Sequence, residues 1–176
     1  MMRFLDYQSY LANARRHGWP PAYQARWAYH AAAIRVAGTL SLTHPGAVLE
    51  IGSFGAQIVP GSDTLDLPQG EWSLPDCPPT WPHDARLLPW PLEAGRYQLL
   101  VALRVWHHLA PVQAQCFREA QRVARHLLIV CPEQETVGVG IHQSQWTAWN
   151  GGPPVHRETL PGWGNLYLFE GKKGTT

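Results

Sequence analysis

Short apolar runs alternate with amphipathic stretches through the middle of the chain. The runs at 47–51, 97–103 and 126–132 are apolar without strict alternation, a pattern typical of strands buried on both faces of a parallel sheet. Between the last two, residues 111–125 place apolar side chains at helical spacing, with Pro111 in the first turn. This alternation of strand and helix predicts an α/β fold with a mostly parallel sheet.

Two helices are predicted before the first apolar strand. Residues 4–16 carry apolar side chains at helical spacing, and residues 22–40 continue after a Trp-Pro-Pro break. In the second helix we expect one stripe to pack against the sheet. The stripe consists of Tyr23, Trp27, Ala31, Ile34 and Gly38. The alternative is that the tyrosines of this helix and Arg26 face a substrate.

The connection after the first strand is predicted to lack a helix. A brief strand should end at Asp66, and Pro60-Gly61 occupy the interval in which a crossover helix would have to fit. Residues 68–83 are rich in proline but poor in charge, which predicts a stiff surface loop rather than disorder. The sequence therefore predicts a loop-rich edge on this side of the sheet.

The C-terminal part departs from the alternating pattern. Residues 137–150 are predicted to form a loop with one helical turn. Residues 154–160 and 165–170 are predicted to form an antiparallel hairpin that finishes the sheet, and residues 172–176 a frayed tail.

Composition narrows the class of protein. A chain of 176 residues fits one domain, and a net charge of +1 with 15% charged residues gives no basic surface for a nucleic acid or an anionic membrane. The three cysteines are too far apart in sequence to suggest a disulfide framework or a metal site. We see no signal peptide and no apolar run long enough to span a membrane, so a cytoplasmic protein is expected.

The first strand ends in a glycine-containing turn, AVLEIGSFG at 47–55. Glycine at this point lets the backbone approach a bound molecule closely and adopt conformations that other residues avoid. A ligand is therefore expected just past the end of the strand. The alternative is a tight turn that closes an ordinary core strand.

The order of these segments resembles the class I S-adenosylmethionine-dependent methyltransferases, in the group with the simple methyltransferase domain. The resemblance covers roughly residues 30–172 and rests on five motifs in order. They are AVLEIGSFG at 47–55, Thr64-Leu65-Asp66, HDARLLPW at 83–90, YQLLVA followed by VWHHL at 97–109, and FREAQRVA at 117–124. The resemblance implies a Rossmann-like sheet with helices on both faces and a C-terminal antiparallel hairpin. Residues 1–42 would form N-terminal helices and 43–172 the core of a single domain, 1–176.

The resemblance also implies which residues bind S-adenosylmethionine. Asp66 would accept the ribose hydroxyls, Asp84 and the Ala85 backbone would meet the adenine, and Glu50 would hold the methionine amino group. For each acid the alternative is a turn former or a solvated surface group. The full set of expected cofactor-binding residues is Glu50, Gly52, Ser53, Gly55, Asp66, Asp84, Ala85 and Ala102.

The reacting end of the site is expected beyond the fourth strand. His107 and His108 have the pKa range for proton removal, and they are the candidate catalytic residues, although packing or capping is the favoured role. His142, Gln145 and Trp146 are the candidate substrate residues, with a polar surface loop as the alternative. No metal site is expected.

Three departures from the motif pattern leave the function open. Phe54 and Ala56 stand where the family usually has glycines, with Gly55 out of step, and Gln98 replaces an acid. A glycine pair before the fifth strand is also absent. The first hypothesis is methyl transfer to a small-molecule acceptor. The alternative is a catalytically inactive fold relative that serves as a partner-binding or assembly module, with a protein partner or homo-oligomer. A dinucleotide-dependent oxidoreductase is third, because the Gly-x-Gly-x-x-Gly loop is missing.

Overall fold

The protein is built on one twisted sheet with helices on both faces. The computed structural model describes residues 2–68, 74, 76–133 and 140–171. Within them the strands are β1 (Val48–Ile51), β2 (Asp63–Asp66), β3 (Trp81–Pro82), β4 (Tyr97–Leu103), β5 (Ala124–Cys131), β6 (His156–Leu160) and β7 (Gly164–Glu170). The helices are α1 (Tyr7–Arg16), α2 (Trp27–Ala37), α3 (Gln113–Val123) and α5 (Gln143–Asn150). Short 3₁₀ turns at Pro21–Arg26, Pro45–Ala47 and Trp106–Leu109 complete them.

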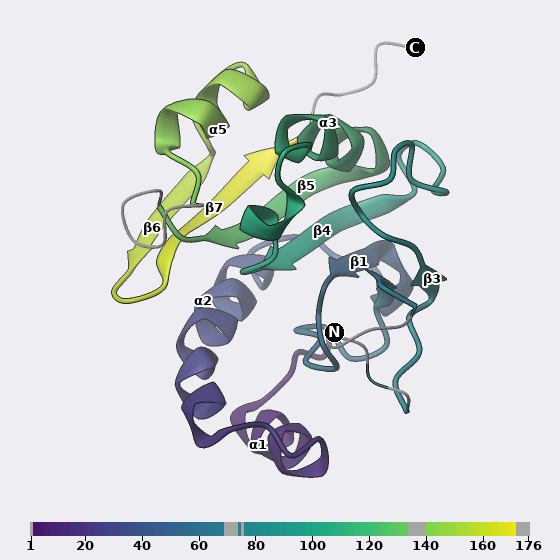
Figure 1. The fold of residues 1–176 in the computed structure, drawn as a ribbon, viewed down its shortest axis with the longest axis vertical. Coiled ribbons are helices and arrows are strands. Elements are labelled where there is room, and N and C mark those ends of the chain that lie inside the picture. Colours follow the sequence, from purple (N-terminus) through teal and green to yellow (C-terminus); the bar gives the residue numbers. More distant parts are fainter. Residues whose placement is uncertain (1, 69–73, 75, 134–139, 172–176) are drawn as a thin grey trace.

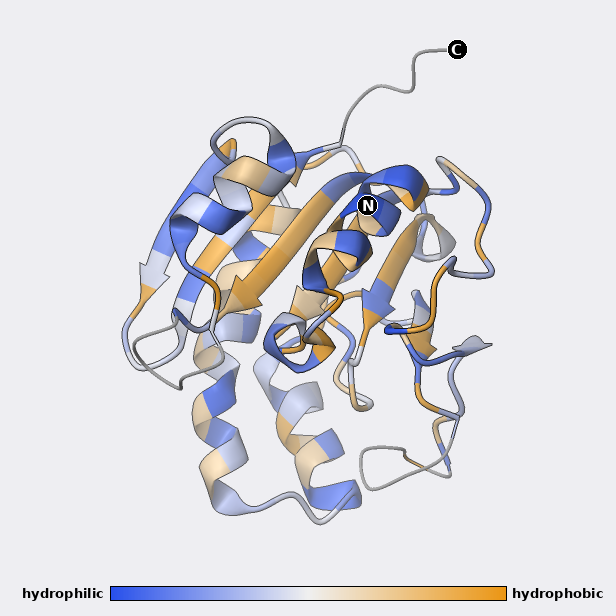
Figure 2. Ribbon diagram, turned by 45° about the horizontal axis from the view of Figure 1, so that its top comes forward, coloured by the Kyte–Doolittle hydropathy of each residue, from blue (hydrophilic) through white to orange (hydrophobic). Residues whose placement is uncertain are grey.

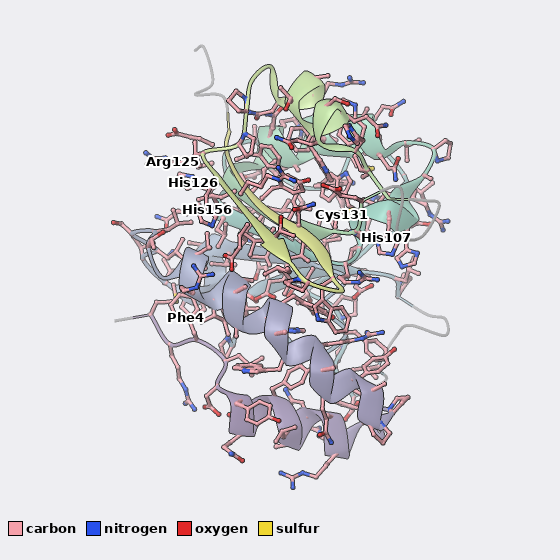
Figure 3. All side chains as sticks on the ribbon, turned by 90° about the vertical axis from the view of Figure 1, so that its left-hand side faces the viewer. Phe4, His107, Arg125, His126, Cys131 and His156 are labelled. Atoms are coloured by element: carbon pink, nitrogen blue, oxygen red, sulfur yellow. The ribbon has the colours of Figure 1, made fainter. Side chains whose placement is uncertain are left out.

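The strands follow the order β3-β2-β1-β4-β5-β7-β6. The first five strands in this order pair in parallel, whereas β7 runs antiparallel to both β5 and β6. The predicted mostly parallel sheet with a C-terminal antiparallel hairpin is therefore confirmed. Cys131, at the carboxyl end of β5, and His107 lie toward one end of the sheet, and Arg125 and His126 lie toward the other (Figure 3). Parallel strands thus deliver the residues that follow them to one edge.

The two faces of the sheet are covered by different helices (Figure 1). On one face α2 packs through Tyr29, Ala33 and Val36 onto side chains of the central strands, such as Val101 and Val130. On the other face α3 and α5 pack through Phe117 and Trp146 in a cluster rich in aromatic rings. The central strands are accordingly the most hydrophobic part of the ribbon (Figure 2). Burial on both sides explains why their sequences show no alternation.

The expected second helix, 22–40, forms as two pieces. A 3₁₀ turn at Pro21–Arg26 precedes α2, which ends at Ala37. The stripe predicted to pack against the sheet is on the wrong face of the helix. Trp27 packs onto the small cluster of Leu5, Tyr10 and Ala56, while Tyr29, Ala33 and Val36 face the sheet. Because so much of α2 is apolar, its sequence pattern does not single out one face.

The β1–β2 connection contains no helix, as predicted. A buried carboxylate organises it, because Glu50 Oε2 accepts from the Ile58 amide at 2.9 Å and Oε1 from the Val59 amide at 2.9 Å. Oε1 also accepts from the Ser62 hydroxyl at 3.0 Å. These bonds satisfy amides that a crossover helix would otherwise pair within itself.

The segment after β5 contains more helix than predicted. The one expected helical turn is the eight-residue helix α5, which begins after His142 and ends at Gly151 with φ 74°. The expected proline-stiffened loop at 68–83 includes the two-residue strand β3, which pairs in parallel with β2. The tail predicted at 172–176 lies outside the described residues. No helix in the described part of the chain is both long and apolar enough to cross a membrane.

Candidate functional site

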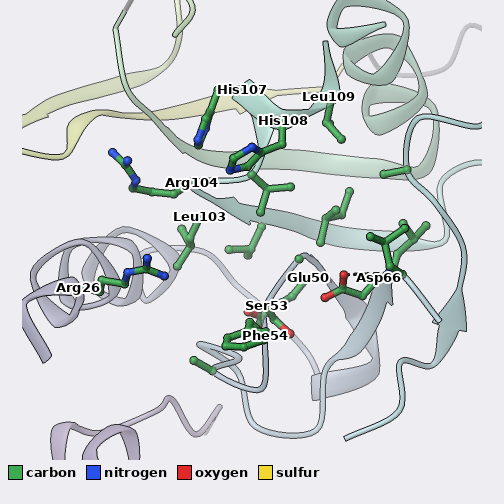
Figure 4. A pocket seen from close by; sticks show the side chains of 18 of the residues that line it. Arg26, Glu50, Ser53, Phe54, Asp66, Leu103, Arg104, His107, His108 and Leu109 are labelled. Atoms are coloured by element: carbon green, nitrogen blue, oxygen red, sulfur yellow. Dashed lines mark hydrogen bonds between the residues drawn. The ribbon is translucent and has the colours of Figure 1, made fainter. Parts of the chain in front are cut away.

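A cavity of about 690 Å³ lies at the carboxyl edge of β1, β2 and β4. This volume is within the range of small-molecule and cofactor sites. Its floor comes from the turn after β1, the end of β2 and the segment after β4, and its far wall from the 3₁₀ turn before α2 (Figure 4). The side chains of the protein therefore leave this edge open.

The cavity brings together most of the residues predicted for the cofactor. The predicted residues that line it are Glu50, Gly52, Ser53, Asp66, Asp84, Ala85, His107 and His108. They come from segments far apart in sequence, and the parallel strand order places them at one edge. Figure 4 shows Asp66 toward one side of the cavity and His107 and His108 toward another.

Glu50 lies under the turn after β1, and the carboxylate is already used by the protein. The side chain is 2% exposed, and both oxygens accept the hydrogen bonds from Ile58, Val59 and Ser62. Burial raises the pKa of Glu50 to about 7, although these hydrogen bonds oppose the rise. The geometry gives Glu50 a role in holding the loop. A direct bond to an amino group in the cavity would have to compete with these contacts.

Asp66 stands at the end of β2 with its carboxylate at the cavity. Burial raises the pKa of Asp66, while hydrogen bonds from the backbone of Leu67 and Phe54 lower it. One oxygen, Oδ1, accepts from the Leu67 amide at 2.9 Å. A half-buried carboxylate at a strand end is suited to accepting hydroxyl donors from a ligand.

Asp84 is more exposed and is engaged by Arg86. The guanidinium donates from Nη2 to Oδ2 at 2.7 Å and from Nε to Oδ1 at 3.0 Å, and this pair lowers the pKa of Asp84. The carbonyl of Ala85 accepts from Trp90 Nε1 at 2.8 Å. Asp84 could accept from an adenine amino group only by sharing its oxygens with Arg86.

The turn after β1 keeps two special backbone positions. Gly52 has φ 61°, and a Cβ there would lie 2.6 Å from Val105 Cγ2, so the close approach to the segment after β4 requires glycine. Phe54 also has positive φ, at 47°. Its ring stacks on Trp19 with a centroid distance of 5.6 Å and an interplanar angle of 19°. The phenyl ring is thus part of the cavity wall.

His107 and His108 follow β4 in a 3₁₀ turn, with ring centroids 3.9 Å apart. Burial, together with the neighbouring His108 and Arg104, lowers the pKa of His107 to about 4. His107 is 8% exposed, and its Nδ1 is buried without a hydrogen-bond partner among the described residues. At neutral pH the ring is therefore uncharged, and its Nδ1 has no hydrogen-bond partner among the described residues.

Five predicted residues do not line this cavity. Ala102 lies on β4 with its side chain in the core on the α3 face, and Gly55 lines a smaller cavity of about 230 Å³ instead. His142 and Gln145 form the capping box of α5, in which Gln145 Oε1 accepts from the His142 amide at 3.0 Å. Trp146 is 0% exposed in the core. The structure thus gives the last three a structural role away from the cavity.

Several lining residues were not among the predicted site residues. Arg104 follows β4 directly, so the strand-end rule that selected His107 and His108 could also have selected it. Tyr10 and Trp19 reach the cavity from the N-terminal segment, whose placement no local pattern indicates. Tyr23, Arg26 and Tyr29 also line it, which agrees with the alternative that these side chains face a ligand.

One group of side chains outside this cavity has metal-ligand chemistry. His17, Asp76 and Cys77 each offer one ligand atom, and these atoms lie within 4.8 Å of one another. The Asp76 carboxylate is also paired with Arg16 Nη2 at 3.0 Å. Since a cation already neutralises this acid, the group does not by itself indicate an ion.

Comparison with known proteins supports the fold. No family model and no curated protein matches the sequence. An Aquifex aeolicus SAM-dependent methyltransferase matches with TM-score 0.54 and 12% identity over 77% of this chain and 87% of that chain. A chain in the complex of the Haloferax volcanii Trm112 methyltransferase activator with a putative methyltransferase matches with TM-score 0.54 and 11% identity, over 91% of this chain and 81% of that chain. This chain therefore has the fold of the class I S-adenosylmethionine-dependent methyltransferases.

Proposed function

We propose that the protein transfers a methyl group from S-adenosylmethionine to a small-molecule acceptor. The observation that carries the proposal is the open cavity of about 690 Å³ at the strand edge, with Asp66 and the His107–His108 pair on its wall. Asp66 would accept the ribose hydroxyls, and the turn from Gly52 to Phe54 would run beside the methionine part. S-adenosylmethionine would supply an electrophilic methyl group on its sulfonium.

His107, the cavity wall and Glu50 would each serve methyl transfer in a different way. The uncharged ring of His107 can accept a hydrogen bond that orients an acceptor hydroxyl or amine, whereas its pKa of about 4 makes it a weak base. Positioning of the acceptor by the surrounding wall can supply much of the rate enhancement. Glu50 would support the turn from below through Ile58 and Val59. We expect the protein to act in the cytoplasm.

Calorimetry with S-adenosylmethionine and S-adenosylhomocysteine tests the proposal. We expect both to bind, and Asp66→Ala to weaken binding about tenfold or more, because charge-assisted hydrogen bonds to the ribose are lost. Glu93→Ala is the matched control, since Glu93 is an exposed carboxylate away from the cavity. Silence with both ligands would contradict the proposal and favour a partner-binding module. Binding of NADH instead would favour an oxidoreductase.

A further inference from the structure

Two arginines at one side of the cavity have no acidic partner. Arg26, at the end of the 3₁₀ turn before α2, holds its Cζ 3.4 Å from the centroid of the Tyr23 ring. Arg104 donates from Nη1 to the Trp163 carbonyl at 3.0 Å. Among the described residues no carboxylate lies within ion-pair distance of either guanidinium. Both arginines line the cavity (Figure 4).

The acids of the cavity do not compensate these two charges. Glu50 is buried in its own hydrogen bonds, and Asp84 is neutralised by Arg86. Asp66 lies on the other side of the cavity, away from Arg26 and Arg104 (Figure 4). The cofactor carries only one carboxylate, which can neutralise only one of the two positive charges. One positive charge in a partly dry site then remains for the acceptor.

The backbone at Arg104 indicates that its side chain is held in place at some cost. Arg104 has φ 60°, in the left-handed region that non-glycine residues rarely adopt. Its amide donates to the Val130 carbonyl at 2.8 Å, and its guanidinium lies 5.6 Å from the Trp163 ring centroid. These contacts fix the cation beside His107 and His108, whose pKa values Arg104 lowers.

Aromatic rings line the same side of the cavity. The Trp19 ring stacks on the Phe54 ring, and its centroid lies 5.8 Å from that of Tyr23. The guanidinium of Arg26 lies over the Tyr23 ring. All three rings are only partly buried. A flat ring can therefore contact this wall while an attached anionic group reaches the arginines.

We propose that Arg26 and Arg104 form an anion-binding subsite for the acceptor, which is a small molecule with a carboxylate on an aromatic ring. The proposal rests on the methyl-transfer function, because it assigns the acceptor half of that cavity. The arginines anchor the acceptor, and His107 lies beside the anchored molecule with its free Nδ1.

Fluorine NMR titration with 4-fluorobenzoate and 4-fluorobenzamide tests the subsite. The two probes share the ring and differ in charge. We expect the acid to bind about tenfold tighter than the amide, and Arg26→Gln or Arg104→Asn to remove that preference, because the charge-assisted bonds are lost. Asparagine is chosen at position 104 because it tolerates positive φ. The titrations are run with and without S-adenosylhomocysteine.

Two further variants and a second ligand, S-adenosylhomocysteine, make the result decisive. Arg26→Lys keeps the charge and should retain part of the preference. Arg35→Gln, which changes an exposed arginine on the adjoining helix α2, should change nothing. Equal binding of acid and amide to the unaltered protein, while S-adenosylhomocysteine binds, overturns the subsite and leaves the methyl-transfer function standing. Loss of S-adenosylhomocysteine affinity in both arginine variants also overturns it, because both cations would then serve the cofactor. A charge preference without any S-adenosylhomocysteine binding supports the subsite and contradicts the methyl-transfer function.

Discussion

Strained backbone and buried charge concentrate at the cavity. In the part of the chain that the structure describes, the non-glycine residues with positive φ are Phe54 and Arg104, and both line the cavity. Glu50, its most buried acid, lies directly below. Features that lower stability persist where the surrounding structure holds them, and they gather at functional sites. At the scale of single residues, this edge therefore differs from the rest of the fold.

The buried carboxylate of Glu50 gives a prediction about stability. In Glu50→Gln, one of the two oxygens becomes an amide NH₂ that faces a backbone N–H donor from Ile58 or Val59. We expect the free energy of unfolding to fall by about 1–3 kcal/mol, because a buried hydrogen bond is lost and a donor is left unpaired. Urea denaturation at pH 8 measures it.

The control for Glu50 is Glu158→Gln. Glu158 forms a surface ion pair with Arg35, so its loss should cost less than about 1 kcal/mol. An equal effect of the two variants would show that the Glu50 carboxylate does not organise the β1–β2 loop.

At the same scale, the sequence predicts cavity residues at the ends of strands, but it does not predict cavity residues that come from the N-terminal segment. Asp66 and His107 were found because buried strands point to what comes after them. Trp19 reaches the cavity only through the path of the N-terminal segment. The position of Trp146 after the fifth strand predicts a place at the cavity, whereas α5 turns the side chain into the core.

At the scale of elements, the strands could be predicted closely and the helices less so. The run at 97–103 matches β4 because a strand buried on both faces has a distinctive apolar sequence. The missing crossover helix followed from Pro60-Gly61. The length of helix α5 is harder to predict from the sequence, because its N-cap is His142 rather than one of the residues usual at that position.

The attachment of α5 to the sheet gives an element-scale prediction. Trp146 is fully buried and contacts the rings of Trp106, Phe117 and Phe169, with centroid distances of 6.0, 5.7 and 5.9 Å. Trp146→Ala should lower the free energy of unfolding by about 3–5 kcal/mol through the cavity it leaves. It should not change S-adenosylhomocysteine affinity, measured by calorimetry at a temperature where the variant is folded.

The neighbouring Trp149 is the control for this helix. It is only half-buried, so Trp149→Ala should cost clearly less stability. Loss of S-adenosylhomocysteine affinity in folded Trp146→Ala would contradict a purely structural role for Trp146.

At the scale of the whole molecule, the sheet could be predicted from the sequence but the closed side of the cavity could not. The mostly parallel sheet and its C-terminal hairpin follow from the alternation of elements and from the motif order, whereas the strand order β3-β2-β1-β4-β5-β7-β6 comes from the structure. The position of α1 and the following turn depends on long-range contacts, such as the Tyr10 hydroxyl donating to the Tyr23 carbonyl at 2.6 Å and the Leu5 amide to Ile58 at 2.9 Å. No periodicity in the sequence encodes these contacts.

His30 lies where these separate parts meet. It is 6% exposed, its ring lies 4.9 Å from Tyr10 and 4.7 Å from Tyr29, and Nδ1 is 3.0 Å from the Arg26 carbonyl. Burial lowers the pKa of His30 to about 4, from an ordinary value of 6.5, while hydrogen bonds with the Arg26 and Ala56 backbone oppose this. The assembled protein therefore keeps this ring uncharged.

This depressed pKa predicts how stability depends on pH. Between pH 6.5 and about 4, His30 is protonated in the unfolded chain but not in the folded protein. The free energy of unfolding therefore falls as the pH falls through that window, and His30 does not affect it above pH 6.5. His107 acts in the same direction, whereas the raised pKa of Glu50 makes its contribution fall as pH rises toward 7. A total pH profile mixes these effects, and the difference between variants separates them.

In His30→Gln, whose amide can still donate to the Arg26 carbonyl, the loss of unfolding free energy from pH 7 to pH 4.5 should be smaller than in the unaltered protein. Urea denaturation across that range measures it, with the exposed His44→Gln as control; an unchanged slope in His30→Gln would mean that His30 is not held uncharged by the packing of α1 and α2.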